Sequence, residues 1–266
     1  MTEELAFSLL IGISVGLSAG YLGGIMVLEK MALVGDALSH VALPGLALGI
    51  LLNFDPILGG FAFLFASSVV IWQLGRVTKL SFETLVGAMF TLSLAAGILM
   101  IQDLEVLEEA LFGDIAQVTW IDAAAGLLIA IVAIYLTRII YNKIVLSMIS
   151  EELAISKGIN VARVNLLYLL LVSLVVAIGI KITGTLLVGF LVVVPAAAAK
   201  NLSANLFRYS LLSSVFGAIS ASAGILLASV LSYLDPPPPP GPLVVVAGVA
   251  IFLITILLRW RKRISI

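Results

Sequence analysis

The sequence predicts an all-α, polytopic membrane protein with nine transmembrane helices, or eight if one weak segment does not cross. Three observations lead to this prediction. The 266 residues are 62% hydrophobic and only 11% charged, far from the roughly 25% charge of soluble domains. Apolar residues continue for the ~20 positions that a helix needs to cross the hydrocarbon core. These runs are unbroken, whereas a transmembrane β-barrel shows short alternating segments.

The expected spans are the long stretches that lie between formal charges. They cover residues 5–28, 37–54, 56–75, 84–102, 123–137, 164–180, 182–199, 209–234 and 236–258. The weakest is 123–137, but Trp120 and Tyr135 are interfacial residues, and Arg138 can snorkel while its helix continues. We expect a single transmembrane domain over residues 1–266, without a soluble module.

The first span carries a stripe of four glycines. Gly12, Gly16, Gly20 and Gly24 follow one another at steps of four, which places them on one helix face. Small residues in this pattern allow the backbone of a neighbouring helix to approach closely. We expect the stripe to serve helix packing.

The basic residues predict how the spans are oriented, because lysine and arginine favour the cytoplasmic side of short loops. An outside N-terminus and a cytoplasmic C-terminus place every basic residue except Lys181 on the inner side. Most acidic residues then lie outside: Glu3, Glu4, Asp55, Asp103, Glu105, Glu108, Glu109, Asp114, Asp122 and Asp235. We expect a plasma (bacterial inner) membrane protein, embedded in the lipid bilayer, whose basic residues are topological anchors. No nucleic acid is expected as a partner.

Two outer connections have features of their own. The acidic loop Gln102–Thr119 is expected to be solvated, or to lie on the membrane or against a soluble partner. The run Pro236–Pro240 predicts a stiff, extended polyproline connector before the last span. This connector could also offer a contact surface to an external protein.

The inner segment 147–163 predicts a short cytoplasmic helix. A serine that can cap it precedes two glutamates at its positive end, and a lysine and a glycine follow at its negative end. The helix is either a docking element for a cytoplasmic partner or an interfacial helix that serves packing alone. Its candidate docking residues are Ser150, Glu151, Glu152, Leu153, Ala154, Lys157 and Gly158.

The motif GDALSHVALPG, residues 35–45, places Asp36 and the only histidine, His40, in the second span. Ionisable side chains are costly there and usually functional. A spacing of four puts both on one helix face. His40 lies ten residues beyond Lys30, which is ~15 Å at ~1.5 Å per residue and close to the middle of a ~30 Å core. Pro44 removes a helix hydrogen bond to the His40 carbonyl, which predicts a kink.

This pair of side chains suggests a metal site that one chain cannot complete. A carboxylate and a neutral imidazole suit Mn, Zn or Fe(II) better than Cu(I), which prefers sulfur. Two ligands are too few to enclose an ion, and a twofold dimer would bring a second pair to the site. Alternatively, Asp36 and His40 form a hydrogen-bonded pair that only stabilises helix packing.

Enzymatic chemistry finds no support in the sequence. With no cysteine and one histidine, the chain offers no thiolate site, no H-E-x-x-H zinc motif and no G-x-S-x-G nucleophile. It also lacks the G-x-x-x-x-G-K-[ST] loop that cradles ATP. Any dependence on ATP must therefore come from a partner.

Four segments together resemble the ABC-3 family of metal-uptake permeases. They are residues 35–45, SEELAISKGI at 150–159, GTLLVGFLVVVPAAAA at 184–199 and the proline-glycine turn before the last span. The resemblance implies an ABC importer permease that forms a homodimeric pore and works with two copies of a cytoplasmic ATPase and an extracytoplasmic metal-binding protein. It also implies that Asp36 and His40 contact the metal, and that residues 151–158 couple to the ATPase.

The main hypothesis is therefore the membrane subunit of an ATP-driven importer of Zn, Mn or Fe. No cofactor is expected to be held permanently, because the metal is cargo and ATP binds only to the partner subunit. Two alternatives remain open. The chain could be a secondary transporter driven by an ion gradient, with Asp36 or His40 as proton carrier. It could also be a structural membrane scaffold.

Overall fold

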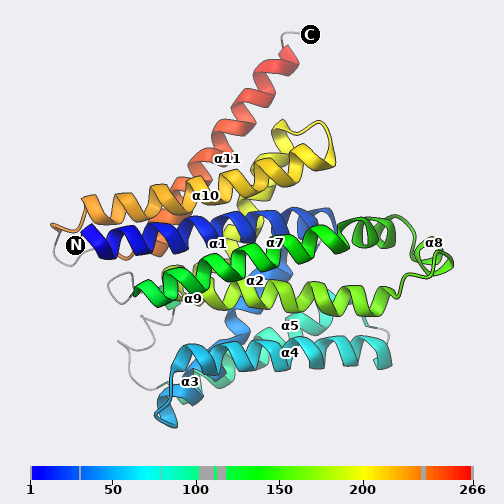
Figure 1. Ribbon diagram of the computed structural model, residues 1–266, viewed down its shortest axis with the longest axis horizontal. Helices are drawn as coiled ribbons and strands as arrows, with labels where there is room; N and C mark the ends of the chain where they lie inside the picture. Colours follow the sequence, from blue (N-terminus) through cyan, green and yellow to red (C-terminus); the bar gives the residue numbers. More distant parts are fainter. Residues whose placement is uncertain are drawn as a thin grey trace.

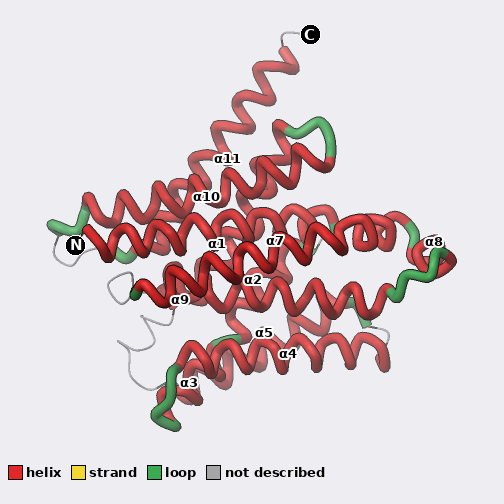
Figure 2. Tube along the Cα trace, viewed as in Figure 1, coloured by secondary structure: helices red, strands yellow, loops and turns green. Residues whose placement is uncertain are grey.

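The computed structural model describes residues 2–29, 31–78, 80–101, 111–112, 118–234 and 238–264, and these residues form helices and short connections without a strand (Figures 1 and 2). The helices are α1 (Thr2–Leu28), α2 (Ala32–Val41), α3 (Leu43–Leu51), α4 (Pro56–Thr78), α5 (Phe82–Met100), α7 (Trp120–Ile149), α8 (Glu151–Ser156), α9 (Val161–Leu202), α10 (Leu206–Val230) and α11 (Pro240–Ile264). Within this part of the chain, eight helices are long and apolar enough to cross a membrane. The predicted all-helical, polytopic fold is confirmed.

The eight candidate spans among the described residues lie within the expected range of eight to nine. The weakest predicted span, 123–137, lies inside α7, a helix of 30 residues that starts with a capping box between Thr119 and Asp122. The predicted span 182–199 forms the second part of α9, which continues from the Gly184 kink to Leu202. The described residues thus contain eight long apolar helices and, in the second part of α9, the shorter apolar stretch Val188–Leu202.

A sharp kink divides α9. Gly184 has φ 70° and ψ 174°, which is outside the helical region and strained for a residue with a side chain. A Cβ at this position would also overlap the backbone of Leu111, so this residue packs directly against the kink. The kink lets the second part of α9 leave the axis of the first and approach α2.

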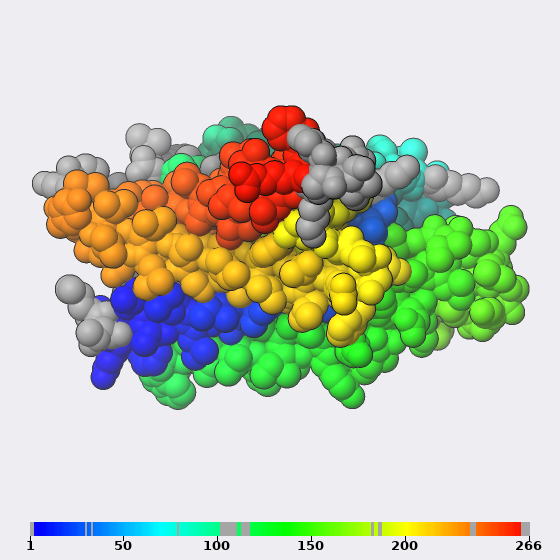
Figure 3. All heavy atoms as spheres, turned by 90° about the horizontal axis from the view of Figure 1, so that it is seen from above, coloured from blue at the N-terminus to red at the C-terminus, as the bar shows by residue number. Residues whose placement is uncertain are grey.

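The predicted glycine stripe on α1 packs against α10. A Cβ at Gly16 would overlap the Gly217 backbone, and one at Gly20 would overlap the backbone of Ser213. This close approach allows the Ser213 hydroxyl to donate to the Gly20 carbonyl at 2.5 Å. The packing role expected for the stripe is confirmed, and Figure 3 shows α1 (blue) beside α10 (yellow to orange).

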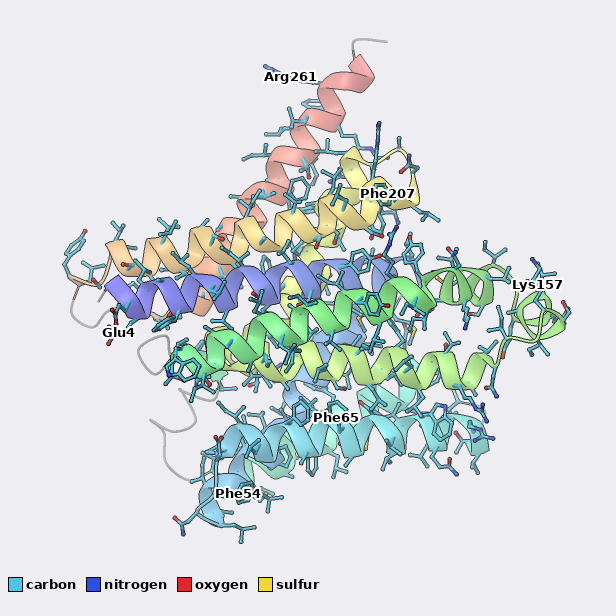
Figure 4. The ribbon with its side chains drawn as sticks, in the orientation of Figure 1. Glu4, Phe54, Phe65, Lys157, Phe207 and Arg261 are labelled. Carbon is cyan, nitrogen blue, oxygen red and sulfur yellow. The ribbon has the colours of Figure 1, made fainter. Side chains whose placement is uncertain are left out.

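The two ends of the helix bundle differ in character. Glu4 and Phe54 lie at one end, and Lys157 on α8 lies at the other (Figure 4). At the Glu4 end, Lys181 forms an ion pair of 2.6 Å with Asp122. The one basic residue that was expected outside therefore sits next to a carboxylate expected on the same side.

The two outer connections are described only in part. Residues 102–110 and 113–117 of the acidic loop lie outside the described residues. Pro236 and Pro237 also lie outside them, and Pro240 is already the first residue of α11. Pro240 thus belongs to the helix and not to the predicted connector, because proline fits the first turn of a helix, where its missing N–H is not needed.

Candidate functional site

The helix that carries Asp36 and His40 is interrupted just after them. α2 ends at Val41 and α3 begins at Leu43, with Pro44 in its first turn. Ala42 between them keeps helical dihedral angles, φ −70° and ψ −25°, and its N–H donates to the Ser39 carbonyl at 3.3 Å. The kink predicted at Pro44 is thus a local break in the hydrogen bonds, and α2 and α3 form one membrane span, Val34–Leu51.

The α9 kink holds α2 in place through its backbone. The Ser39 hydroxyl lies 2.5 Å from the Thr185 carbonyl oxygen, one residue after Gly184, and 2.6 Å from the Asp36 carbonyl oxygen. The Thr185 hydroxyl is itself buried and has no hydrogen-bond partner. Sequence reasoning missed both Ser39 and Thr185, because their role depends on a contact between segments 146 residues apart.

His40 is almost completely buried, with 7% of its surface exposed. Its ring packs against Phe90 on α5, with ring centres 5.2 Å apart. Its Nδ1 atom is buried and makes no hydrogen bond. Buried polar atoms in native proteins usually have a partner, and an orphaned one requires an explanation.

Asp36 is half-buried and lies against Gly189 on the second part of α9. Among the described residues, no hydrogen bond or ion pair joins its carboxylate to His40 or to another side chain. The hydrogen-bonded Asp36–His40 pair, which was the structural alternative for this motif, is therefore not formed. Both side chains keep free lone pairs inside a membrane-spanning helix.

These two groups can ligate a cation but cannot enclose one. In the described part of the chain, no cluster of three or more His, Cys, Asp or Glu side chains could hold a metal. A carboxylate oxygen, an imidazole nitrogen and a neighbouring hydroxyl are suitable donors for Mn or Zn. Completion of the site requires donors from outside this set, as the sequence indicated.

The predicted inner helix is α8, and its ends are as expected. The Ser150 hydroxyl accepts from the Leu153 N–H at 3.1 Å, which caps the first turn. Gly158 ends the helix with φ 75°, and its N–H donates to the Ile155 carbonyl at 2.9 Å. Ala154 is fully buried, whereas Leu153 is 45% and Ile155 is 58% exposed. The helix presents apolar side chains at the Lys157 end of the bundle.

A cavity of about 690 Å³ lies beneath α8, between the ends of α1, α5 and α7. Glu29 and Glu151 line it together with Met31, which directly precedes α2. Burial raises the pKa of Glu29 from 4.5 to about 7. Sequence reasoning missed Glu29, because a single carboxylate at the end of a span shows no pattern that distinguishes it from an exposed one.

The stability of the protein is expected to fall as pH rises from about 4.5 to 7, because Glu29 binds its proton more tightly in the folded state than in the unfolded state. Glu29→Gln removes this decline, since the amide is neutral at every pH. We expect the variant to gain roughly 1–3 kcal/mol over the wild type at pH 8, and almost nothing at pH 4.5. Thermal unfolding in detergent measures the difference. Glu83→Gln, at an exposed carboxylate, is the matched control. Parallel pH profiles for Glu29→Gln and wild type would contradict the prediction.

Comparisons with known proteins place this arrangement in context. The ABC 3 transport family matches residues 1–259. The manganese transport system membrane protein MntC of Listeria innocua is 29% identical over 249 residues, which cover 92% of this chain and 88% of that protein. The high-affinity zinc uptake system membrane protein ZnuB of Haemophilus influenzae is 30% identical over 268 residues, which cover 98% and 100%.

A solved structure is similar to the whole helix arrangement. It is "PsaBC from Streptococcus pneumoniae in complex with Fab", with a TM-score of 0.79 and 28% sequence identity. The match covers 93% of this chain and 89% of that one. Four segments of the sequence indicated a resemblance to metal-uptake permeases. The comparisons extend this resemblance to nearly the full length of the chain and to its fold.

Proposed function

The chain belongs to the ABC 3 transport family, and from this premise we propose that it imports a divalent transition metal through a site formed by Asp36 and His40. It is a multi-pass membrane protein and a permease subunit of a bacterial ABC importer, not an enzyme. The observation that carries the proposal is the pair of unpartnered ligand groups in the span Val34–Leu51, one of them an orphaned imidazole nitrogen. Such groups are costly in a membrane unless they serve a pathway.

Manganese or zinc is the proposed cargo, with iron(II) as a further ion that the same donors accept. Relatives are named for manganese and for zinc. The donor types do not separate these ions, because carboxylate and imidazole suit each of them. Metal analysis of the purified complex by mass spectrometry identifies the bound ion and its number per permease.

A homodimer is part of the proposal. Two copies related by a twofold axis would contribute two carboxylates and two imidazoles, which is enough for a four-ligand site. Two copies of a cytoplasmic ATPase would drive transport, and an extracytoplasmic metal-binding protein would deliver the ion. The Glu4 end of the bundle would then face outward and the Lys157 end would face the cytoplasm.

The experiment that tests this function is metal uptake into vesicles that contain the permease with its ATPase. We expect uptake that requires ATP and saturates with manganese or zinc. The secondary-transporter alternative instead predicts uptake by the permease alone under a pH gradient. Uptake under a pH gradient without the ATPase would overturn the proposal.

In this scheme α8 couples the permease to the ATPase through its exposed apolar side chains. Leu153→Asp combined with Ile155→Asp is expected to reduce ATP-driven uptake at least about tenfold, because each substitution would bury an unpaired charge in the contact with the ATPase. The fold should be unaffected, since exposed substitutions usually change stability by about 0.5 kcal/mol or less. Leu80→Asp, at an exposed apolar residue between α4 and α5 and outside the candidate spans, is the control. Retained ATPase binding and uptake in the double variant would contradict coupling through α8.

A further inference from the structure

We propose that a second cavity, between α1, α7 and α10, binds the phosphate-bearing headgroup of an anionic phospholipid, with Arg138 as its cationic anchor. The cavity has a volume of about 460 Å³ and shares no residue with the Asp36–His40 site. It is lined by Tyr21, Arg138, Tyr141, Asn142, Leu206, Phe207 and Ser210. The proposal is independent of the transported ion.

Arg138 has no anionic partner in the part of the chain that the structure describes. Its guanidinium carbon lies 6.0 Å from the centre of the Phe207 ring, and it interacts with the Tyr21 phenol. An arginine in this position keeps its planar set of N–H donors available, and that set matches the oxygen atoms of a phosphate group.

The rest of the lining adds hydrogen-bond donors and no negative charge. The Tyr141 hydroxyl and the Ser210 hydroxyl lie 3.3 Å apart, and the rings of Tyr21 and Tyr141 are 6.5 Å apart. Asn142 contributes an amide. No acidic side chain lines this cavity, in contrast to the cavity next to Glu29. Its chemistry therefore fits an anion that accepts several hydrogen bonds.

The position of Arg138 along α7 matches the boundary of the bilayer. Eighteen residues separate it from the interfacial Trp120 at the start of the helix, which is ~27 Å at ~1.5 Å per residue. The hydrocarbon core is ~30 Å thick. Figure 4 places Phe207 toward the end of the bundle that carries Lys157. Arg138 is thus at headgroup depth on that side.

Two exposed apolar strips lead from the cavity toward the middle of the membrane. On α7, Tyr135 and Ile131 precede Arg138 by three and seven residues, so they share its helix face. On α10, Leu211 and Val215 follow Phe207 by four and eight residues and form a second strip. Both strips are exposed to the bilayer and can contact acyl chains, which a soluble phosphate compound does not have. A phospholipid uses the charged cavity and the strips together.

Lipid retention on the purified protein tests the assignment. Wild type, Arg138→Gln and Arg208→Gln are exchanged into micelles that contain phosphatidylglycerol or phosphatidylcholine. Native mass spectrometry then measures how much lipid each protein retains. Arg208 is exposed and adjacent to Phe207 but does not line the cavity, so it controls for general surface charge. We expect Arg138→Gln to retain roughly fivefold less phosphatidylglycerol, because one basic residue near an anionic lipid surface contributes about that factor in binding. Arg208→Gln should match the wild type.

A second arm separates lipid from free anion. Thermal unfolding is measured with phosphatidylglycerol and with inorganic phosphate, and we expect stabilisation of the wild type by the lipid alone. Equal lipid retention by wild type and Arg138→Gln would overturn the proposal. Stabilisation by inorganic phosphate equal to that by phosphatidylglycerol would also overturn it, because the cavity would then be a site for a soluble anion.

Discussion

Replacement of Asp36 by asparagine, or of His40 by alanine, is expected to reduce metal uptake to the background of vesicles without the complex. Each change removes one of the two ligand groups that the chain places in the span Val34–Leu51. Loss of a group that only orients a metal ligand already costs about 10–100-fold in affinity, so loss of the ligand itself should cost at least as much. In a dimer each substitution removes two ligands. We therefore expect a decrease of at least about 100-fold.

The measurement is ATP-dependent uptake of manganese or zinc into vesicles, with the bound metal counted in the purified complex. Assembly must be intact, which co-purification of the ATPase and the unfolding temperature establish. We expect Asp36→Asn to fold normally, because its carboxylate holds no described hydrogen bond whose loss would leave a buried group unpaired. Glu83→Gln removes an exposed carboxylate elsewhere and should transport normally. Wild-type uptake by either assembled site variant would exclude this pair as the metal site.

The same two variants also test whether Asp36 and His40 bind metal or only stabilise the fold. A scaffold role predicts that Asp36→Asn and His40→Ala lose assembly together with transport. The orphaned Nδ1 atom and the absence of a bond between the two side chains argue against that outcome. If the variants aggregate while Glu83→Gln remains soluble, the pair serves stability and the metal proposal fails.

Most of the fold could be predicted from the sequence, because length and charge decide which segments enter a membrane. The stretch around α7 was the weakest, and its helix continues past Arg138 as snorkelling allows. The kink at Gly184 could not be predicted, since one glycine within an apolar run carries no signal that distinguishes a kink from helix packing. The division of α9 into two parts at Gly184 therefore became visible only in the structure.

The site could be predicted only in part, for a related reason. Asp36 and His40 stand out because charge and imidazole are rare in an apolar segment. Ser39 and Thr185 do not stand out, since hydroxyl residues are common in membrane helices and these two matter through contact with each other. Gly189 is equally inconspicuous in the sequence, although it sets the distance between α2 and α9. Such contacts follow from tertiary packing and leave no local pattern.

Gly189→Val is expected to abolish transport while both ligand residues remain in place. A Cβ at this position would overlap the Asp36 Cα and lie beside its carboxylate oxygen. A clash with backbone cannot be relieved by a rotamer change, so α2 must move as a whole and carry His40 with it. Overpacking of this kind costs typically about 1–3 kcal/mol. We expect an unfolding temperature lower by several degrees and uptake reduced at least about tenfold.

The matched control for this prediction is Gly87→Val on α5. A Cβ at Gly87 would meet no atom of a neighbouring element within 4 Å, so the same change should leave stability and uptake close to wild type. Gly189→Ala adds the same overlapping Cβ but no atoms beyond it. Its stability and uptake should therefore lie between those of the wild type and those of Gly189→Val. Because the effect arises from displacement of α2, bound metal should fall together with uptake in the Gly189 series. Normal metal content and transport in Gly189→Val would show that α2 does not depend on this contact, and the geometry that joins the α9 kink to the Asp36–His40 site would then be wrong.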